Sequence, residues 1–506
     1  MVGGHPRCLE YVDALLSGGR GSYPDVTTRL AARLSARLNI TDLDTWFAEH
    51  ATLDAALAET ITQGADEVLL DQLLDGLATI PGTEELLLGI SVYRAPVDQA
   101  GLLFQAGIPD PDAAAQPAAD AREQITAILA AAGMPLDRPV DLAELPASVQ
   151  QQVRPYLAIS TVRPTPPFRY PPGLRRLVEA CTVSSLLAAD TSQDPPALVV
   201  HRWTASELHK RWTRDGRGDQ LTAAHLRAAG YWQWRVQVWP QDRARDLDDL
   251  IEARYHLFAA GHTAEADQLT WHVCGLLHDW GAWDREDALI RDTLTQLPAD
   301  ADGRSNWTRQ LADIARGRGR ITQAAQLYQQ ALAIDQQQVQ LDPANTSFQR
   351  NLSVTYSKLA DLAGAAGNTA EAARLHQQAL AIFERLAQLD PANTSSQRDL
   401  AISYSKLADL AGDAGNTAEA ARLHQQALAI FERLAQLDPA NTGAQRDLAV
   451  SYSRLADLAA TSEDPGSAAA IYRQALGFCE NLYGTDHPLT QAIRDKIRGH
   501  GEDGSA

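Results

Sequence analysis

The sequence predicts a mainly α-helical protein whose C-terminal half is a solenoid of stacked helix pairs. The segment NTAEAARLHQQALAIFERLAQLDPANT begins at Asn368 and recurs unchanged at Asn416, 48 residues later. Good helix formers such as Ala, Leu, Gln and Arg are abundant, whereas β-branched residues are scarce. Self-similarity at a fixed period is typical of repeat architectures, because one helix pair cannot bury its apolar faces without stacked neighbours.

Each repeated unit contains two amphipathic helical patterns. In the middle unit the first lies in QRDLAISYSKLADLAGDAG and the second follows Asn416, and both place apolar residues at spacings of three to four. We expect Gly415 to end the first helix, since glycine adopts the left-handed conformation readily. Pro439 in DPANT is expected to stop the second helix.

This pattern resembles the tetratricopeptide repeat. On its first helix the family places a large residue, a Leu-small pair and a further small or large residue, matched here by Tyr404, Leu407, Ala408 and Ala411. On its second helix it places small, aromatic and small residues, matched by Ala420, His424 and Ala427. The period of 48 exceeds the family's usual length of about 34, so the second helix is expected to run about two extra turns. We predict a solenoid over residues 246–498 and a disordered tail over 499–506.

Residues 1–245 lack the repeat. Helical patterns precede a stretch rich in Pro, Ala, Asp and Gln near 109–172, whose composition predicts a long inserted loop or a partly disordered segment. A helix, a strand and another helix then follow. This order resembles the C-terminal part of STAND/NB-ARC-like signalling NTPases, which implies a helical subdomain over 1–66 and a winged-helix-like domain over 67–245.

Two short motifs carry that resemblance. Gly4-His5-Pro6 matches the Gly-x-Pro turn of the helical subdomain, and Val200-His201-Arg202 stands where the family has Met-His-Asp. The resemblance implies that Gly4, Pro6 and His201 lie near a bound nucleotide, with Pro6 at the adenine and His201 at the phosphates. Arg202 in place of Asp departs from the family pattern. The alternative for His201 is a purely structural role, in which backbone hydrogen bonds beside a turn satisfy its imidazole.

The sequence contains no complete catalytic motif. A P-loop requires a Gly-Lys pair, and none occurs in the chain, so we expect no enzymatic activity and no required cofactor. ADP or ATP is expected only if a P-loop subdomain joins this chain in cis or in trans. Cys274 and His278 share a helix face, but two ligands do not make a metal site, and we predict none.

The net charge of −20 makes nucleic acid an unlikely partner, because an acidic surface repels phosphate backbones. A local basic face could still bind nucleic acid, and the basic residues that lie close together in sequence are Arg202, Lys210, Arg211, Arg214 and Arg217. The structural alternative is that they form an ordinary solvated helix face. No signal sequence or membrane-spanning run is apparent, so we predict a cytoplasmic protein without membrane contact.

A periodic row of charged and hydroxyl side chains is the candidate partner-binding groove. Matching positions of the first helices carry the following residues: Asp313, Asp361, Asp409 and Asp457; Ser357, Ser405 and Ser453; Lys358, Lys406 and Arg454. One interpretation is intrahelical pairing three residues apart at an exposed surface. The other is a polar groove that hydrogen-bonds a protein or peptide. The sequence leaves both open.

The functional hypothesis is a regulatory or sensor module of a STAND-like signalling protein. Its solenoid would bind a protein or peptide partner and couple this to a nucleotide-dependent switch. Two alternatives remain: a free-standing tetratricopeptide adaptor without nucleotide, and a winged-helix transcriptional regulator. The helix that begins at Leu174 weakens the last alternative, since its Arg175 and Arg176 lie at its start only.

Overall fold

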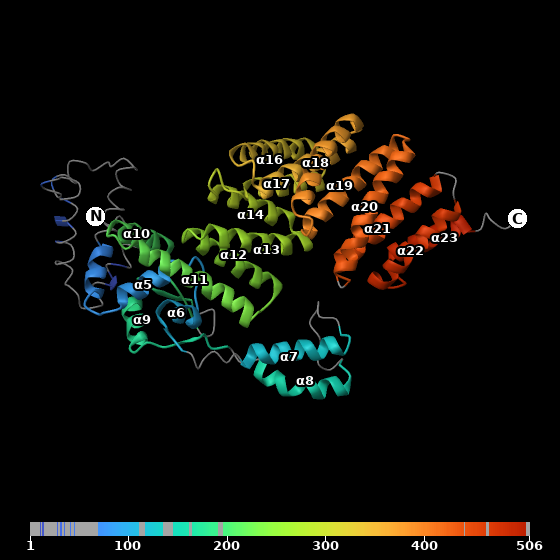
Figure 1. Ribbon diagram of the computed structural model, residues 1–506. Helices are drawn as coiled ribbons and strands as arrows, with labels where there is room; N and C mark the ends of the chain where they lie inside the picture. The colour runs from blue at the N-terminus through green and yellow to red at the C-terminus, as the bar shows by residue number, and fades with distance from the viewer. Residues whose placement is uncertain are drawn as a thin grey trace. The chain divides into compact units, whose positions relative to one another are not determined.

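The computed structural model is mainly α-helical, as the sequence predicts (Figure 1). It describes residues 69–110, 117–134, 145–160, 164–190, 196–439, 441–461 and 465–501, with a few single residues before 69. The chain divides into two compact units, Met1–Asp279 (unit 1) and Trp280–Ala506 (unit 2), and each is treated by itself below. The predicted subdomain over 1–66 lies almost wholly outside the described residues. Among the described helices, none combines the length and the apolar character needed to cross a membrane.

Unit 1 contains a domain with the element order of a winged helix. Its elements are α5 (Thr83–Ser91), α6 (Gln99–Ala106), α9 (Leu174–Val183), β3 (Ala188–Asp190), β4 (Ala197–Val199) and α10 (Arg202–Arg214). β3 and β4 form an antiparallel hairpin in which Ala188 pairs with Val199. Val97, between α5 and α6, adds a bridge to Leu198 of β4. A helix, a strand residue, two helices and a hairpin thus follow one another, which agrees with the predicted winged-helix-like fold.

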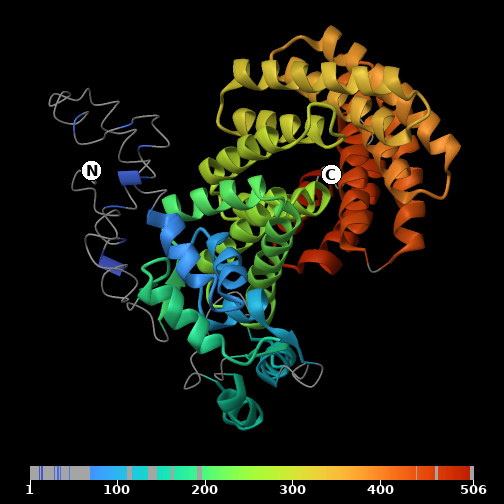
Figure 2. The same cartoon turned by 90° about the vertical axis from the view of Figure 1, so that its left-hand side faces the viewer.

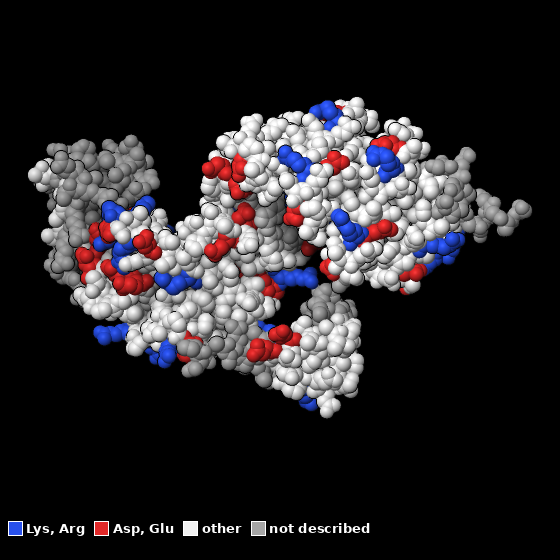
Figure 3. Space-filling view, in the orientation of Figure 1, with Lys and Arg blue, Asp and Glu red and all other residues white. Residues whose placement is uncertain are grey.

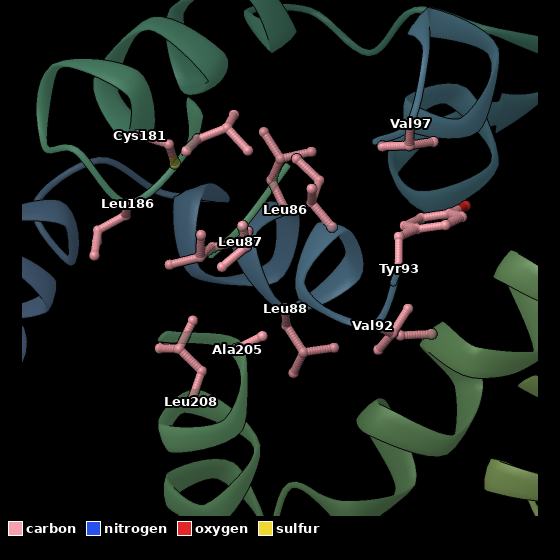
Figure 4. Packing of buried hydrophobic residues seen from close by; sticks show 14 of the residues in the cluster. Leu86, Leu87, Leu88, Val92, Tyr93, Val97, Cys181, Leu186, Ala205 and Leu208 are labelled. Atoms are coloured by element: carbon pink, nitrogen blue, oxygen red, sulfur yellow. The ribbon is translucent and has the colours of Figure 1, made fainter. Parts of the chain in front are cut away.

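The core of this domain is aliphatic and centres on α5. The sequence TEELLLGIS places Leu86, Leu87 and Leu88 in a row, and all three are at most 2% exposed. α5 is therefore covered on several sides. Figure 4 shows Leu88 beside Ala205 of α10, with Cys181 and Leu186 approaching from the α9 side. Burial of this row fixes α9 and α10 around α5.

The insertion between α6 and α9 is partly helical, so the prediction of a long loop is wrong for two segments. β1 (Ile108–Pro109) pairs antiparallel with β2 (Phe168–Arg169) at its base. Beyond this pair, α7 (Pro117–Ala131) and α8 (Ala147–Ser160) pack on each other through a small cluster that includes Leu129, Val149 and Val153. The Ala-rich composition that suggested disorder also suits helices, because alanine loses little entropy in a helix.

Unit 1 continues with α11 (Gly218–Val238), α12 (Arg243–Ala259) and α13 (Thr263–Asp279). α11 buries Tyr231 and Trp232, which are 2% and 6% exposed, and packs on α12. The predicted start of the solenoid at residue 246 therefore falls inside unit 1, whereas packing divides the chain after Asp279. Helix-pair rhythm and compactness are different criteria, and the boundary at 246 stays a prediction.

Unit 2 is a stack of antiparallel helices (Figure 2). It consists of α14 (Trp283–Gln296), α15 (Arg304–Gly317), α16 (Ile321–Leu341), α17 (Thr346–Ala365), α18 (Thr369–Leu389), α19 (Thr394–Asp413), α20 (Thr417–Leu437), α21 (Thr442–Thr461), α22 (Pro465–Tyr483) and α23 (Pro488–Gly501). Four successive repeat units are formed by the pairs α15–α16, α17–α18, α19–α20 and α21–α22, and α23 packs on the last of them. Below, unit 1 and unit 2 always mean the two compact parts of the chain, and other units are these repeat units.

The repeated residues explain the pairing of these helices. Within a pair, small residues allow the two helices to approach closely: a Cβ added at Gly412 would lie 3.8 Å from the Cβ of Ala420. Ala408 and Ala420 are both at most 1% exposed. Gly415 lies between the helices with φ 77°, the left-handed conformation expected of it. The second helices α18 and α20 are each 21 residues long, as the extended period predicts, and α20 ends at Leu437 before Pro439.

The DPANT turn also supplies a helix cap that the sequence analysis missed. The Asn393 side chain accepts a hydrogen bond from the Ser396 backbone N–H at 3.0 Å and so caps the N-terminus of α19. Asn345 has the same role for α17. The signal was available, because Asn is among the preferred capping residues and recurs with every turn.

Candidate functional site

The predicted groove residues all lie on the first helices of the four units, α15, α17, α19 and α21. Each aspartate is paired with a cation of the following unit. The contacts of this aspartate ladder are Lys358 Nζ–Asp313 at 2.8 Å, Lys406 Nζ–Asp361 at 3.0 Å, Arg454–Asp409 at 2.7 Å and Lys496 Nζ–Asp457 at 2.6 Å. Lys496 belongs to α23, so the last helix completes the ladder.

Each of these aspartates also contacts the second helix of its own unit. The Tyr328 hydroxyl donates to Asp313 at 2.5 Å, and Tyr472 donates to Asp457. His376 and His424 approach Asp361 and Asp409 at 3.4 Å and 3.5 Å in the same way. These are the residues at the family's aromatic position. One carboxylate therefore joins three helices, and the ladder stabilises the stacking of units.

Burial changes the protonation of this ladder. It lowers the pKa of His424 to about 4, and the nearby Arg454 guanidinium acts in the same direction. The 3.5 Å contact of His424 with Asp409 is therefore not an ion pair at pH 7. Burial also raises the pKa of Asp409. At Asp361 burial has the same tendency, but hydrogen bonds from His376 and Lys406 outweigh it and lower the pKa of that carboxyl.

A second set of contacts, the arginine ladder, runs in the opposite direction along the same helices. Arg350 pairs with Asp399 of the next unit at 2.6 Å, and Arg398 pairs with Asp447 at 2.5 Å. This ladder was not predicted from the sequence. On the face that Figure 3 shows, basic side chains of unit 2 mostly lie beside acidic ones, which agrees with such mutual neutralisation.

Between the two ladders lies a small pocket. It has a volume of about 160 Å³ and is lined by Ile402, Ser405, Lys406, Phe431, Asp447, Val450, Ser451 and Arg454. Asp447 belongs to the arginine ladder, whereas Lys406 and Arg454 belong to the aspartate ladder. Val450, one of these lining residues, is 44% exposed. The residues 48 positions earlier are of the same kinds, with Ile402 and Ser403 in place of Val450 and Ser451.

The hydroxyl of Ser451 is a polar group without a partner in this pocket. Ser451 and Ser403 are each 2% exposed, and within the described part of the chain neither hydroxyl has a hydrogen-bond partner. Most buried polar groups are paired, because an unpaired one costs about 1–3 kcal/mol. The predicted groove serines differ from these. Ser357 donates to the Ser353 carbonyl at 3.0 Å, Ser405 lines the pocket, and Ser453 is half-buried on α21.

The contact between the first repeat unit, α15–α16, and the second, α17–α18, is called the first joint below, and it is built differently. Where later units have Ser357 and Phe383, it has Arg309 and Asp335. These form a buried ion pair at 3.0 Å, and the Thr355 hydroxyl donates to the same carboxylate at 2.5 Å. Asp335 is 0% exposed, and burial raises its pKa. This ion pair stands where the pocket at Ser451 has Ser405 and Phe431.

Of the three residues predicted to lie near a bound nucleotide, the structure describes only His201. His201 is the N-cap of α10, and its Nδ1 accepts a hydrogen bond from the Trp203 backbone N–H at 3.3 Å. Gly4 and Pro6 lie outside the described residues. Cys274 and His278 both lie on α13, and the described residues include no group of three metal-ligating side chains.

Comparison with known proteins identifies the repeats. Residues 352–391, 400–439 and 448–489 match the family model of the tetratricopeptide repeat. The C-terminal half of this chain carries tetratricopeptide repeats. The unit formed by α15 and α16 lies outside the match. Its Ala312, Ala324 and Tyr328 are 0% exposed, and their counterparts in the tetratricopeptide repeats that match are at most 4% exposed.

Among curated proteins no match was found. Several solved structures are similar. BtubC from P. vanneervenii is 20% identical over 48% of this chain and 91% of its own, with a TM-score of 0.38. A STAND protein with a tetratricopeptide repeat sensor from Pyrococcus horikoshii is 11% identical over 91% of this chain and 68% of its own, with a TM-score of 0.29. YrrB, a tetratricopeptide protein with an unusual peptide-binding site, is 15% identical over 45% of this chain and 91% of its own, with a TM-score of 0.24.

Proposed function

We propose that the tetratricopeptide repeats bind an extended segment of a partner protein along their first helices, and that the chain works by binding and not by catalysis. The observation that carries this proposal is the pocket at Ser451, whose buried hydroxyl has no partner among the described residues. A peptide N–H or carbonyl placed over the pocket would satisfy that hydroxyl.

The size of the pocket supports an extended segment. At about 160 Å³ it is smaller than the roughly 300–1,000 Å³ typical of drug-sized ligands, and it suits one side chain. Because the lining residues recur every 48 positions, successive units offer similar positions to successive parts of one chain. A segment that spans several units gains affinity from each of them.

The ladders indicate which side chains that segment carries. Lys406 and Arg454 already contact Asp361 and Asp409, and Asp447 contacts Arg398. A charged partner residue would have to compete with these pairs and lose its hydration as well. The groove therefore favours apolar or small hydroxyl side chains, with Val450 and Ile402 as their contacts.

Site-specific crosslinking tests this proposal. A photo-crosslinking residue is placed at Val450, and a matched control is placed at Gln425, which is exposed on the second helix α20. We expect one partner protein to crosslink from position 450 only. Against the identified partner, Val450→Arg is expected to weaken binding at least about tenfold, while Gln425→Arg leaves it unchanged. Equal crosslinking from both positions, or full binding by Val450→Arg, would sink the proposal.

We further propose that the chain is a regulatory module of the STAND type, in which the winged-helix-like domain links nucleotide to partner binding. The order of a winged-helix-like domain followed by tetratricopeptide repeats supports this, as does the place of His201 at the start of α10. The positive end of a helix dipole lies there and favours phosphate.

Calorimetry with ADP and ATP tests the nucleotide link. His201→Ala would remove both the imidazole and the helix cap, so His201→Asn is the sharper variant, since Asn keeps a capping oxygen. Micromolar binding by the wild type that is lost in His201→Asn is the expected result. If the wild-type chain binds neither nucleotide, the switch is excluded for this chain, and an adaptor without nucleotide is the function that remains.

A further inference from the structure

We propose that unit 1 binds a small polyanionic ligand, bearing phosphate or carboxylate groups, in a cleft between α10 and α12. The cleft has a volume of about 1080 Å³, and residues 91–95, here called the floor segment, contribute to its lining. It is lined by Ser91, Val92, Tyr93, Arg94, Ala95, Val200, Arg202, Ala205, Ser206, His209, Lys210, Thr213, Arg214, Glu252 and Tyr255. It lies in unit 1 alone, so the proposal is independent of the peptide groove.

The charge of the cleft is opposite to that of the chain. The sequence has 64 acidic and 44 basic residues, yet the described residues that line the cleft include four basic residues and one acidic residue. Three of the cations, Arg202, Lys210 and Arg214, share one face of α10, because their spacings of four and eight follow the helical period. The fourth, Arg94, belongs to the floor segment beside α12.

Two of the three α10 cations, Arg202 and Arg214, are weakly neutralised by the described residues. Within the described residues Arg202 has no ion pair, and the guanidinium of Arg214 comes no closer than 3.8 Å to Asp215. Lys210 does contact Glu207 at 2.7 Å, but its side chain is 69% exposed. Arginine suits phosphate and carboxylate because its planar fork donates two parallel hydrogen bonds.

Arg94 is held in place on the other side of the cleft. It donates two hydrogen bonds to Glu252, at 3.1 Å and 2.8 Å, and its guanidinium lies 3.7 Å from the centre of the Tyr255 ring. Arg94 and the cations of α10 lie on different elements of one cleft. Because Arg94 is already paired with Glu252, the charge left for a ligand comes from the three cations of α10. A ligand that neutralises more than one of these cations must carry at least two anionic groups.

Uncharged groups of α10 and of the floor segment offer hydrogen bonds in the cleft. His209 Nε2 is 3.0 Å from the Ser91 hydroxyl, and burial lowers the pKa of this imidazole. His209 is therefore neutral at pH 7 and can serve as a donor or an acceptor. The volume suits a ligand larger than a single phosphate ion.

Titration of the full chain with inorganic pyrophosphate, and separately with citrate, tests the proposal by calorimetry. The cleft variant is Arg202→Gln/Arg214→Gln. The matched control is Arg374→Gln/Arg422→Gln, which removes two exposed arginines from α18 and α20 and so changes the net charge equally. Circular dichroism checks that both variants stay folded.

We expect saturable binding that weakens at least about tenfold in the cleft variant and stays unchanged in the control. Preference for pyrophosphate identifies a phosphate ligand, and preference for citrate identifies a carboxylate ligand; each supports the site. His201→Asn is expected to bind as the wild type does, because His201 does not line the cleft. Absence of saturable binding to either anion, or an equal loss in the control variant, would overturn the proposal.

Discussion

At the scale of single residues, the most unusual feature is the buried pair of Arg309 and Asp335. Their counterparts 48 positions later are Ser357 and Phe383, so the chain itself contains an uncharged version of the same joint. Buried ion pairs are costly to desolvate, and removal of one partner leaves a charge unpaired in the core. We therefore expect the stability of the first joint to fall when one of the two residues is replaced, and to be kept when both are replaced together.

We predict that Asp335→Ala destabilises the solenoid by about 3–5 kcal/mol, since Arg309 would keep its charge without a partner. Arg309→Ser/Asp335→Phe copies the next unit and is expected to be neutral or to stabilise by about 1–4 kcal/mol. Urea unfolding followed by circular dichroism measures both. A double variant as unstable as the single one would show that this joint requires the ion pair.

The residue scale also shows what sequence could and could not predict. The aspartates were found because they recur with the period, but their partners were ambiguous. Lys358 lies three residues before Asp361 and 45 residues after Asp313, and the sequence fits either pairing. The structure has the contact to Asp313 in the preceding unit. Hydroxyls such as Ser451 could not be singled out, because their burial depends on how the next unit stacks.

At the scale of elements, the helix pair α11–α12 contains two buried histidines in contact. His225 Nδ1 and His256 Nδ1 are 3.0 Å apart, and the residues are 5% and 0% exposed. Burial lowers the pKa of His225 to about 4, with His209 acting in the same direction. Burial lowers the pKa of His256 to about 2, with further contributions from His225 and Arg94. Both imidazoles stay neutral in the folded chain at pH 7.

We predict that unit 1 loses stability as pH falls from 6.5 towards 4. In that window the unfolded chain protonates these histidines and the folded chain does not, so protons favour unfolding. The loss between pH 6.5 and pH 5 is roughly 1–2 kcal/mol for each histidine. Urea unfolding followed by tryptophan fluorescence measures it. His225→Gln/His256→Leu should flatten the pH dependence, whereas His262→Gln, at an exposed histidine, should leave it unchanged; an unaltered slope in the double variant would refute the assignment.

At the scale of the whole molecule, the fold could be predicted from the sequence where the sequence is periodic. The solenoid was predictable because two units share a long identical segment, and both helices of each unit follow from their apolar spacing. The insertion at 109–172 has no such repetition, and its helices α7 and α8 bury only a small cluster. Composition alone could not distinguish that marginal pair from a loop, since alanine and glutamine suit both.

We predict that deletion of residues 391–438 leaves a folded protein. This removes one period and joins Asp390 to Pro439, which restores the native turn sequence. Arg454 would then face Asp361, and Arg350 would face Asp447, so both ladders close again. We expect cooperative unfolding at a lower midpoint temperature. Deletion of 391–414 removes α19 only and is expected to abolish folding, because it breaks the alternation of helices; equal behaviour of the two deletions would contradict this.

The opposite directions of the two ladders have a consequence for how such a chain evolves. Each internal unit supplies a cation to the unit before it through one ladder and an arginine to the unit after it through the other. Duplication or loss of one internal unit in the gene therefore leaves every charge matched. The number of repeat units is therefore free to vary between lineages. The length of the partner segment that the groove can bind would vary with it. At any number of units, Lys496 of α23 would pair with the aspartate of the last one.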